Sequence, residues 1–185
     1  MSELRFPLND RDHIVGPADA PVTLVEYGDY QCLHCQAAWP QVELVLRRFG
    51  RGLRYAYRHF PISTVHPLAK PAAECAEFAG AHGLFWEMHS AIYANGHRLS
   101  GATLFAIAGQ LGLDGAALRN ALERGNYGSK VEADFLSGVR SGVNGTPCFF
   151  VNGQRHEGSY AAPDLIAAIA AVAQKARPHK IHIRL

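Results

Sequence analysis

Two cysteines separated by two residues are the side chains of this sequence best suited to chemistry. The motif Cys32-Leu33-His34-Cys35 follows, after four residues, the mostly apolar, β-branched run 21–27, which is typical of a buried strand. A CxxC pair at the point where a strand turns into a helix can form and open a disulfide reversibly. The sequence therefore predicts thiol–disulfide exchange within a βαβ unit.

The position of each thiol in the expected helix 32–49 predicts its role. Cys32 would lie at the helix N-terminus, where free backbone N–H groups and the helix dipole stabilise a thiolate, so we expect it to be the nucleophile. Cys35 would lie about one turn further in, shielded from solvent, as suits a resolving thiol. His34 could add positive charge near the Cys32 thiolate; the alternative is an exposed helix residue without a role.

Glu26 lies six residues before Cys32, inside the expected strand. Strand alternation places it on the same side as Val22 and Leu24, so its carboxyl group would be buried. Buried carboxyl groups have raised pKa values and can relay protons, here to and from Cys35. The alternative is a glutamate at a strand end that pairs with an arginine or lysine.

The CxxC spacing also occurs in zinc sites, which usually need four ligands. The other cysteines, Cys75 and Cys148, are isolated, and the histidines besides His34 are scattered without ligand-like spacing. We therefore expect no metal ion, no iron–sulfur cluster and no bound organic cofactor. For Cys148, the two readings are a third active-site thiol and a small buried strand residue.

A second signature, 142–153, contains Thr146-Pro147 ahead of an apolar run. Proline is tolerated at the first residue of a strand, so we expect a turn around Asn144 followed by a buried strand over 148–151. Asn152-Gly153 is typical of a tight hairpin turn, here leading into 154–157.

With these motifs, the chain resembles the DsbA-like branch of the thioredoxin superfamily over about 21–174. The resemblance rests on the Glu26 to Cys32 spacing, Cys-x-His-Cys, Pro40, Arg58-His59-Phe60-Pro61, His66-Pro67-Leu68-Ala69, and Gly145-Thr146-Pro147 with Phe149-Phe150-Val151-Asn152-Gly153 after it. Two positions depart from the family pattern. Leu33 replaces the proline of the best-known member, which leaves the redox potential open, and Cys148 replaces what is more often a small non-thiol residue.

The resemblance implies a role for each site residue. Cys32 would be the nucleophile and Cys35 the resolving thiol, with His34 as thiolate stabiliser and Glu26 as buried proton relay. Thr146-Pro147 would form a cis-proline edge that binds the substrate.

The long stretch between the expected strand 53–59 and Thr146 predicts an insertion. Its apolar spacing predicts helices over 67–82, 84–94, 101–111, 114–123 and 126–143, and a final helix over 159–176. The resemblance implies that the helical block is inserted as a lid, which gives an α/β thioredoxin fold with an inserted helical subdomain. The expected units are an N-terminal extension 1–20, a thioredoxin-like domain split into 21–62 and 143–176, the lid 63–142, and a C-terminal tail 177–185.

Composition limits the partners. The chain has 185 residues, 48% of them hydrophobic, and can bury a core without structural disulfides. Its net charge of +2 includes no basic block, so we expect no nucleic acid, and no apolar run is long enough to predict a membrane span. Glu3 and Arg5 lie where a signal peptide needs an apolar core, so a cytoplasmic location is expected unless a natural leader has been removed.

The sequence as a whole predicts a monomeric, DsbA-like protein disulfide oxidoreductase. It would reduce, exchange or isomerise disulfides of substrate proteins or small thiols, together with a redox partner that the sequence does not identify. Cytosolic thiol pools favour reduction or reshuffling over disulfide formation. Two alternatives remain. One is a glutathione-dependent transferase or isomerase on the same fold, disfavoured by the presence of two active-site cysteines. The other is a non-enzymatic peptide- or metal-binding module that uses the lid groove.

Overall fold

One mixed five-stranded sheet forms the centre of the molecule. The computed structural model describes residues 2–176, so the expected tail 177–185 lies outside the described residues. The strands are ordered β1-β3-β2-β4-β5, with β2 and β3 parallel and the other neighbouring pairs antiparallel. Their bounds are His13–Val15 for β1, Val22–Gly28 for β2, Leu53–His59 for β3, Cys148–Val151 for β4 and Gln154–Arg155 for β5.

The composition of β2 explains its central place in the sheet. A strand that is covered on both faces is apolar along nearly its whole length. Val22 and Leu24 are buried in the core on one face, and Val25 and Tyr27 in the core on the other. Glu26 is the one charged residue of this strand, and alternation places it on the face of Val22 and Leu24.

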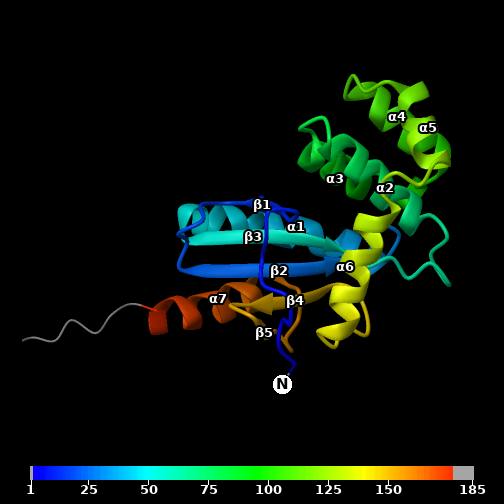
Figure 1. Ribbon diagram of the computed structural model, residues 1–185. Helices are drawn as coiled ribbons and strands as arrows, with labels where there is room; N and C mark the ends of the chain where they lie inside the picture. Colours follow the sequence, from blue (N-terminus) through cyan, green and yellow to red (C-terminus); the bar gives the residue numbers. More distant parts are fainter. Residues whose placement is uncertain (1, 177–185) are drawn as a thin grey trace, which may run out of the picture.

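Every helix predicted from the sequence is present, with ends shifted by at most three residues. Figure 1 shows α2 to α5 gathered beyond the end of the sheet at which β2 and β3 finish, with α6 leading back toward the strands. The bounds are Leu33–Phe49 for α1, Ala69–Gly80 for α2, Phe85–Ala94 for α3, Gly101–Gln110 for α4, Gly115–Glu123 for α5, Gly128–Arg140 for α6 and Ala162–Ala176 for α7.

Different helices cover the two faces of the sheet. On one face, α1 contributes Val42 and Val45, and α7 contributes Leu165 and Ile169, to a core that continues into α2 and α3. On the other face, a smaller core contains Phe60 and is covered by α6 and the N-terminal segment. The CxxC helix and the inserted helices therefore share one continuous core.

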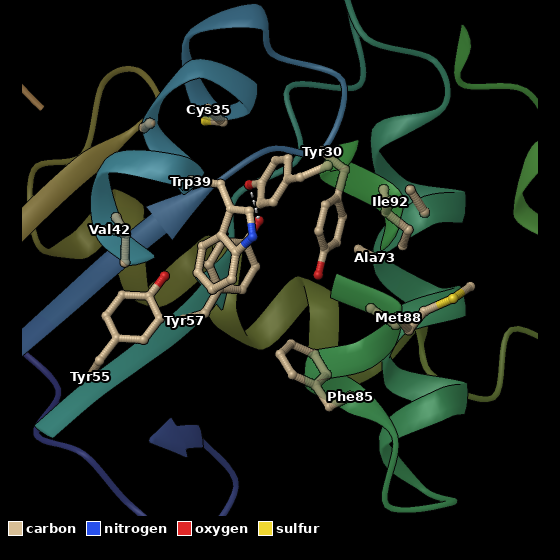
Figure 2. Packing of buried hydrophobic residues seen from close by; sticks show 14 of the residues in the cluster. Tyr30, Cys35, Trp39, Val42, Tyr55, Tyr57, Ala73, Phe85, Met88 and Ile92 are labelled. Atoms are coloured by element: carbon tan, nitrogen blue, oxygen red, sulfur yellow. Dashed lines mark hydrogen bonds between the residues drawn. The ribbon is translucent and has the colours of Figure 1, made fainter. Parts of the chain in front are cut away.

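Aromatic side chains join the sheet to the inserted helices. In Figure 2, Trp39 of α1 lies between Tyr55 of β3 and Tyr30 of the loop before α1, and Phe85 and Met88 of α3 line the opposite side. Because aromatic pairs at these distances add stability beyond simple burial, this layer attaches the insertion firmly to the sheet.

The N-terminal segment adds an edge strand to the sheet. β1 pairs antiparallel with β3, so that His13 lies opposite Tyr57, and Glu3 forms an isolated bridge with Gln154. The sequence pattern does not predict β1, because three residues are too few to show strand periodicity. The first twenty residues, expected as a separate extension, are thus partly integrated into the sheet.

Candidate active site

Cys32 and Cys35 lie at the start of α1 in very different surroundings. Cys32 is the residue that caps the helix N-terminus, with extended backbone angles, and its carbonyl accepts a hydrogen bond from the Gln36 N–H at 3.0 Å. Both cysteines are free thiols. Cys32 is 7% exposed and Cys35 fully buried, whereas Leu33 between them is 74% exposed. The two thiols therefore differ in access to solvent, in the order that the sequence predicts.

The surroundings of Cys32 favour its thiolate. A hydrogen bond from the Cys35 thiol is the largest of the effects that lower the pKa of Cys32 to about 5; burial opposes it, and Thr146 and the N–H groups of Cys35 and His34 add to it. The Cys32 Sγ also lies 3.4 Å from the Thr146 carbonyl oxygen. The Thr146–Pro147 peptide bond is cis, as the resemblance implies.

The surroundings of Cys35 have the opposite effect. Burial raises the pKa of Cys35 well above its usual value, and the hydrogen bond to Cys32 and the nearby Glu26 charge raise it further. One group counteracts them: the backbone N–H of Asp29 donates to the Cys35 Sγ at 3.4 Å. Cys35 is therefore a thiol at rest and needs help to lose its proton.

Glu26 is buried next to the thiol pair. It is 1% exposed, and its Oε2 accepts a hydrogen bond from the Tyr55 hydroxyl at 2.7 Å. Burial raises the pKa of Glu26 to about 7, and the Tyr55 hydrogen bond opposes this rise. Within residues 2–176 no lysine or arginine forms an ion pair with Glu26, so the alternative of a paired surface glutamate does not describe it.

The His34 ring lies on the exposed side of α1. Its Nδ1 is 3.5 Å from the hydroxyl of Tyr160, and the two ring centroids are 6.2 Å apart. The residue's backbone N–H is among the groups that lower the pKa of Cys32. A contribution of the imidazole charge to the Cys32 thiolate stays a prediction.

The two remaining cysteines, Cys75 and Cys148, are both buried. Cys148 packs with Val25 and Phe150 in the core on the opposite face of the sheet, and burial raises its pKa. Cys75 is buried in α2, where burial raises its pKa to about 12. The position of Cys148 fits the interpretation of a small buried strand residue.

Three site residues were missed by the sequence-based predictions. Asp29 and Gln31 lie in the loop between β2 and α1, and each forms hydrogen bonds with the segment before α2. Tyr55 is the hydrogen-bond partner of Glu26. The sequence gives one signal for Asp29 and Gln31, which is their position between a buried strand and the CxxC motif. It gives none for the hydrogen bonds of these three residues, because their partners come from distant segments.

The expectation that the histidines are scattered is wrong for two of them. Glu77 Oε1 accepts hydrogen bonds from the Nε2 atoms of His13 and His59, at 2.9 and 2.8 Å, although the three residues are far apart in sequence. His59, Glu77 and Asp134 are close enough to share a metal ion. However, the Lys130 ammonium already lies 2.6 Å from Asp134 and supplies a positive charge there.

Comparison with known proteins agrees with this fold. The thioredoxin family profile matches residues 8–171. The chain is 45% identical over 168 residues to the Na(+)/H(+) antiporter NhaA 1 of Salinispora arenicola, covering 90% of this chain and 26% of that protein. It is 42% identical over 176 residues to NhaA 3 of Salinispora tropica, covering 95% of this chain and 27% of that protein. The chain thus spans about a quarter of the length of these curated relatives.

Solved structures match over nearly the whole chain. Oxidised BdbD from Bacillus subtilis superposes with a TM-score of 0.79 at 19% identity, covering 94% of this chain and 98% of that one. A thioredoxin-like oxidoreductase from Silicibacter pomeroyi gives 0.77 at 25% identity, covering 91% and 95%. Wolbachia pipientis α-DsbA1 also gives 0.77, at 20% identity, covering 94% and 96%.

The chain belongs to the thioredoxin family, and its fold matches that of DsbA-like proteins. The predicted α/β thioredoxin fold is confirmed. The Cys32–Cys35 pair at the start of α1 places on this fold the two thiols that thiol–disulfide exchange requires. Within residues 2–176 no helix has the length and apolar character needed to cross a bilayer.

Proposed function

We propose that this chain is a thiol–disulfide oxidoreductase that exchanges disulfides with substrate proteins, and that its CxxC pair is more oxidising than that of thioredoxin. The observation that carries the proposal is the low pKa of Cys32, about 5. A stabilised thiolate stabilises the reduced enzyme, which makes its disulfide a stronger oxidant. Thioredoxin, whose nucleophilic cysteine has a pKa of about 7, is a weaker oxidant than DsbA, whose corresponding pKa is about 3.5.

The roles of the site residues follow from their surroundings. Cys32 attacks a substrate disulfide, or is attacked in the oxidised enzyme by a substrate thiolate. Glu26 exchanges a proton with Cys35, since its pKa of about 7 lets it accept and release protons near neutral pH. Thr146 and Pro147 form the edge along which an extended substrate segment lies beside Cys32.

The direction of electron flow depends on the compartment and the redox partner. In the cytoplasm, where the sequence-based expectation places the protein, glutathione would hold the pair reduced, and it would reduce or isomerise disulfides. In an oxidising compartment the same pair would donate its disulfide to reduced substrates. Trapping the thiols with an alkylating agent in intact cells distinguishes the two states.

The two alternatives from the sequence have less support. A glutathione-dependent transferase needs one activated thiol, whereas this site contains two thiols, one with a lowered and one with a raised pKa. A non-enzymatic metal-binding module would use the group around His59 and Glu77, where Lys130 already provides the positive charge.

Equilibration with glutathione buffers tests the proposal. We expect a potential between those of thioredoxin and DsbA, about −270 and −120 mV. A value at or below that of thioredoxin would contradict it. Insulin reduction should be abolished by Cys32→Ser, and Cys35→Ser should accumulate a mixed disulfide with the substrate. A monomer by light scattering is expected for both variants.

A further inference from the structure

The Asp29 carboxylate joins the CxxC loop to the segment that leads into the inserted helices. Its Oδ2 accepts hydrogen bonds from the Ile62 N–H and from His66 Nδ1, each at 2.8 Å. Its Oδ1 accepts the Gln31 N–H at 2.8 Å. The Asp29 side chain is completely buried, and His66 is 24% exposed. Because a buried carboxylate is costly unless fully hydrogen-bonded, these three bonds hold Asp29 in one place.

Gln31 makes a second connection between the same two segments. Its Oε1 accepts a hydrogen bond from the Leu68 N–H at 2.7 Å, at the residue that caps the N-terminus of α2. The loop between β2 and α1 is therefore fixed at two points to the segment 62–68. We call the four residues Asp29, Gln31, His66 and Leu68, with the Ile62 N–H, the Asp29 latch.

The latch bears directly on the resolving thiol. The backbone N–H of Asp29 points at the Cys35 Sγ, at 3.4 Å, and its carbonyl accepts the Cys32 N–H at 3.2 Å. The N–H belongs to the Gly28–Asp29 peptide, whose carbonyl oxygen accepts the Phe60 N–H at 2.8 Å. The side-chain bonds to Ile62 and His66 hold Asp29 on the other side of that N–H. Of the groups around Cys35, this N–H is the one that favours the thiolate, whereas burial, Cys32 and Glu26 oppose it.

We propose that Asp29 and His66 are positioning residues for Cys35: they hold the Asp29 N–H where it stabilises negative charge on the Cys35 sulfur. The inference rests on the proposed function and refines one half of it. It assigns the His66-Pro67-Leu68-Ala69 motif, which has no role in the CxxC chemistry itself, to the support of the resolving thiol.

Cys35 carries negative charge at one step of the reaction, whether the enzyme reduces or oxidises its substrate. During reduction, Glu26 or solvent takes the Cys35 proton, and the Cys35 thiolate attacks the Cys32 sulfur of the mixed disulfide. The Cys32–Cys35 bond forms, the bond from Cys32 to the substrate sulfur breaks, and the substrate leaves as a thiolate. During oxidation, a substrate thiolate attacks Cys32 and Cys35 leaves as the thiolate. A leaving thiol whose anion is stabilised departs faster.

The reaction of the reduced enzyme with 5,5′-dithiobis(2-nitrobenzoic acid) separates the two steps. Attack by Cys32 releases one coloured thiolate, and resolution by Cys35 releases the second. In Asp29→Ala, we expect the second release to slow about tenfold, the equivalent of one lost hydrogen bond to a charged group, with the first release within about twofold of wild type. His66→Gln should slow the second release in the same direction by a smaller factor.

The pH profile distinguishes positioning from a general loss of structure. In both variants the rate of the second release should rise at higher pH than in the wild type, because the Cys35 thiolate has lost a donor. Asp114→Ala is a matched control: it removes a carboxylate that accepts two backbone N–H bonds at the start of α5, away from the cysteines. It should leave both releases unchanged.

Equal slowing of both releases, or a second release unchanged in folded Asp29→Ala, would overturn the positioning role. If Asp29→Ala does not fold, the profile of His66→Gln decides alone: an unshifted profile rejects the proposal. Failure of the proposed function looks different, because Cys32→Ser would then retain turnover whatever the latch variants do.

Discussion

The two thiols lie one helical turn apart, and their surroundings act on them in opposite directions. The Cys35 thiol, the Thr146 side chain and two backbone N–H groups lower the pKa of Cys32, whereas burial and the nearby Glu26 raise that of Cys35. The proton and the negative charge are thus separated before any substrate arrives. A pKa of about 5 favours the Cys32 thiolate at neutral pH, and the raised pKa of Cys35 favours its thiol, as the proposed roles of nucleophile and resolving thiol require.

Thr146 offers a direct test of the Cys32 environment. Its hydroxyl oxygen is buried without a hydrogen-bond partner, and the Thr146 side chain is among the groups that lower the pKa of Cys32. Thr146→Val keeps the shape but removes the hydroxyl, so we expect the pKa of Cys32 to rise by up to about one unit. The rate of iodoacetamide alkylation against pH measures this. Thr64→Val, in the loop before α2, is the control, and an unchanged midpoint in Thr146→Val would exclude the hydroxyl as a stabiliser.

Glu26 should reduce the stability of the fold at neutral pH. The pKa of Glu26 rises from 4.5 in the unfolded chain to about 7 in the folded protein. Below about pH 4.5 the carboxyl group is neutral in both states and its burial does not reduce stability, whereas above pH 7 the buried group is charged and the loss of stability is complete. The difference corresponds to an upper estimate of about 3 kcal/mol. Glu26→Gln should therefore stabilise the protein at pH 8 and have little effect at pH 4.5, as measured by urea unfolding of the dithiol form. An equal effect at both pH values would mean that the carboxyl group does not titrate in this range.

Spacing and strand alternation predicted the surroundings of the candidate site residues, but not the residues that hold them in place. Cys32, Cys35 and Glu26 lie on consecutive elements, where strand alternation and helix position predict their surroundings. Tyr55 and His66 come from β3 and the segment before α2, and their bonds to Glu26 and Asp29 depend on how these elements pack. Periodicity carries no information about such contacts.

At the scale of elements, alternation along β4 places neighbouring residues in different cores, one on each face of the sheet. Phe149 and Val151 face the core shared with α1, whereas Cys148 and Phe150 face the opposite core. Cys148 follows the cis-proline directly in sequence but points to the other side of the sheet from the CxxC pair. Proximity along the chain is therefore a poor guide to a third active-site thiol.

Cys148→Ala should consequently retain disulfide reductase activity within about twofold of wild type, with a loss of about 1 kcal/mol in stability from the removed sulfur. Alkylation followed by mass spectrometry should modify Cys148 only after unfolding. A Cys35–Cys148 bridge in the oxidised protein, or lost turnover in the variant, would require a three-thiol mechanism.

The elements that the sequence predicted well are those with long apolar periodicity, such as α1 and α7. β1 was not predicted because it is short and its partners lie in β3. The boundaries proposed for the inserted lid, 63–142, remain a prediction, although the segment that contains α2 to α6 does separate β3 from β4.

At the scale of the whole molecule, a buried polar group fastens the inserted helices to the sheet. Glu77 of α2 binds His13 of β1 and His59 of β3, while Asp134 of α6 accepts the His59 N–H at 3.1 Å and pairs with Lys130. Four elements from both parts of the chain thus meet at one place. Because a buried carboxylate stripped of its partners is costly, each contact depends on the others.

This arrangement makes the attachment sensitive to acid. Burial alone would raise the pKa of Glu77, but the hydrogen bonds and charges of His13 and His59 outweigh it and hold that pKa well below the usual value. A carboxyl group with a lowered folded pKa contributes stability that is complete above its unfolded value, near 4.5, and is lost as the pH falls toward the folded value. The Glu77 contribution should therefore be present at pH 7 and decrease below pH 4.5.

Glu77→Gln keeps the shape and one acceptor but removes the charge. We expect it to lower the free energy of unfolding at pH 7 by about 3 kcal/mol, the typical effect of breaking a buried ion pair, and to differ less from the wild type as the pH falls below 4.5. Urea unfolding across pH measures this difference, and hydrogen exchange should place the loss in α2. Glu74→Gln, one turn earlier on the same helix, is the control, because burial raises the pKa of Glu74 and its removal should not destabilise more at pH 7 than in acid. A destabilisation by Glu77→Gln that does not change with pH would show that Glu77 acts through packing rather than through its charge.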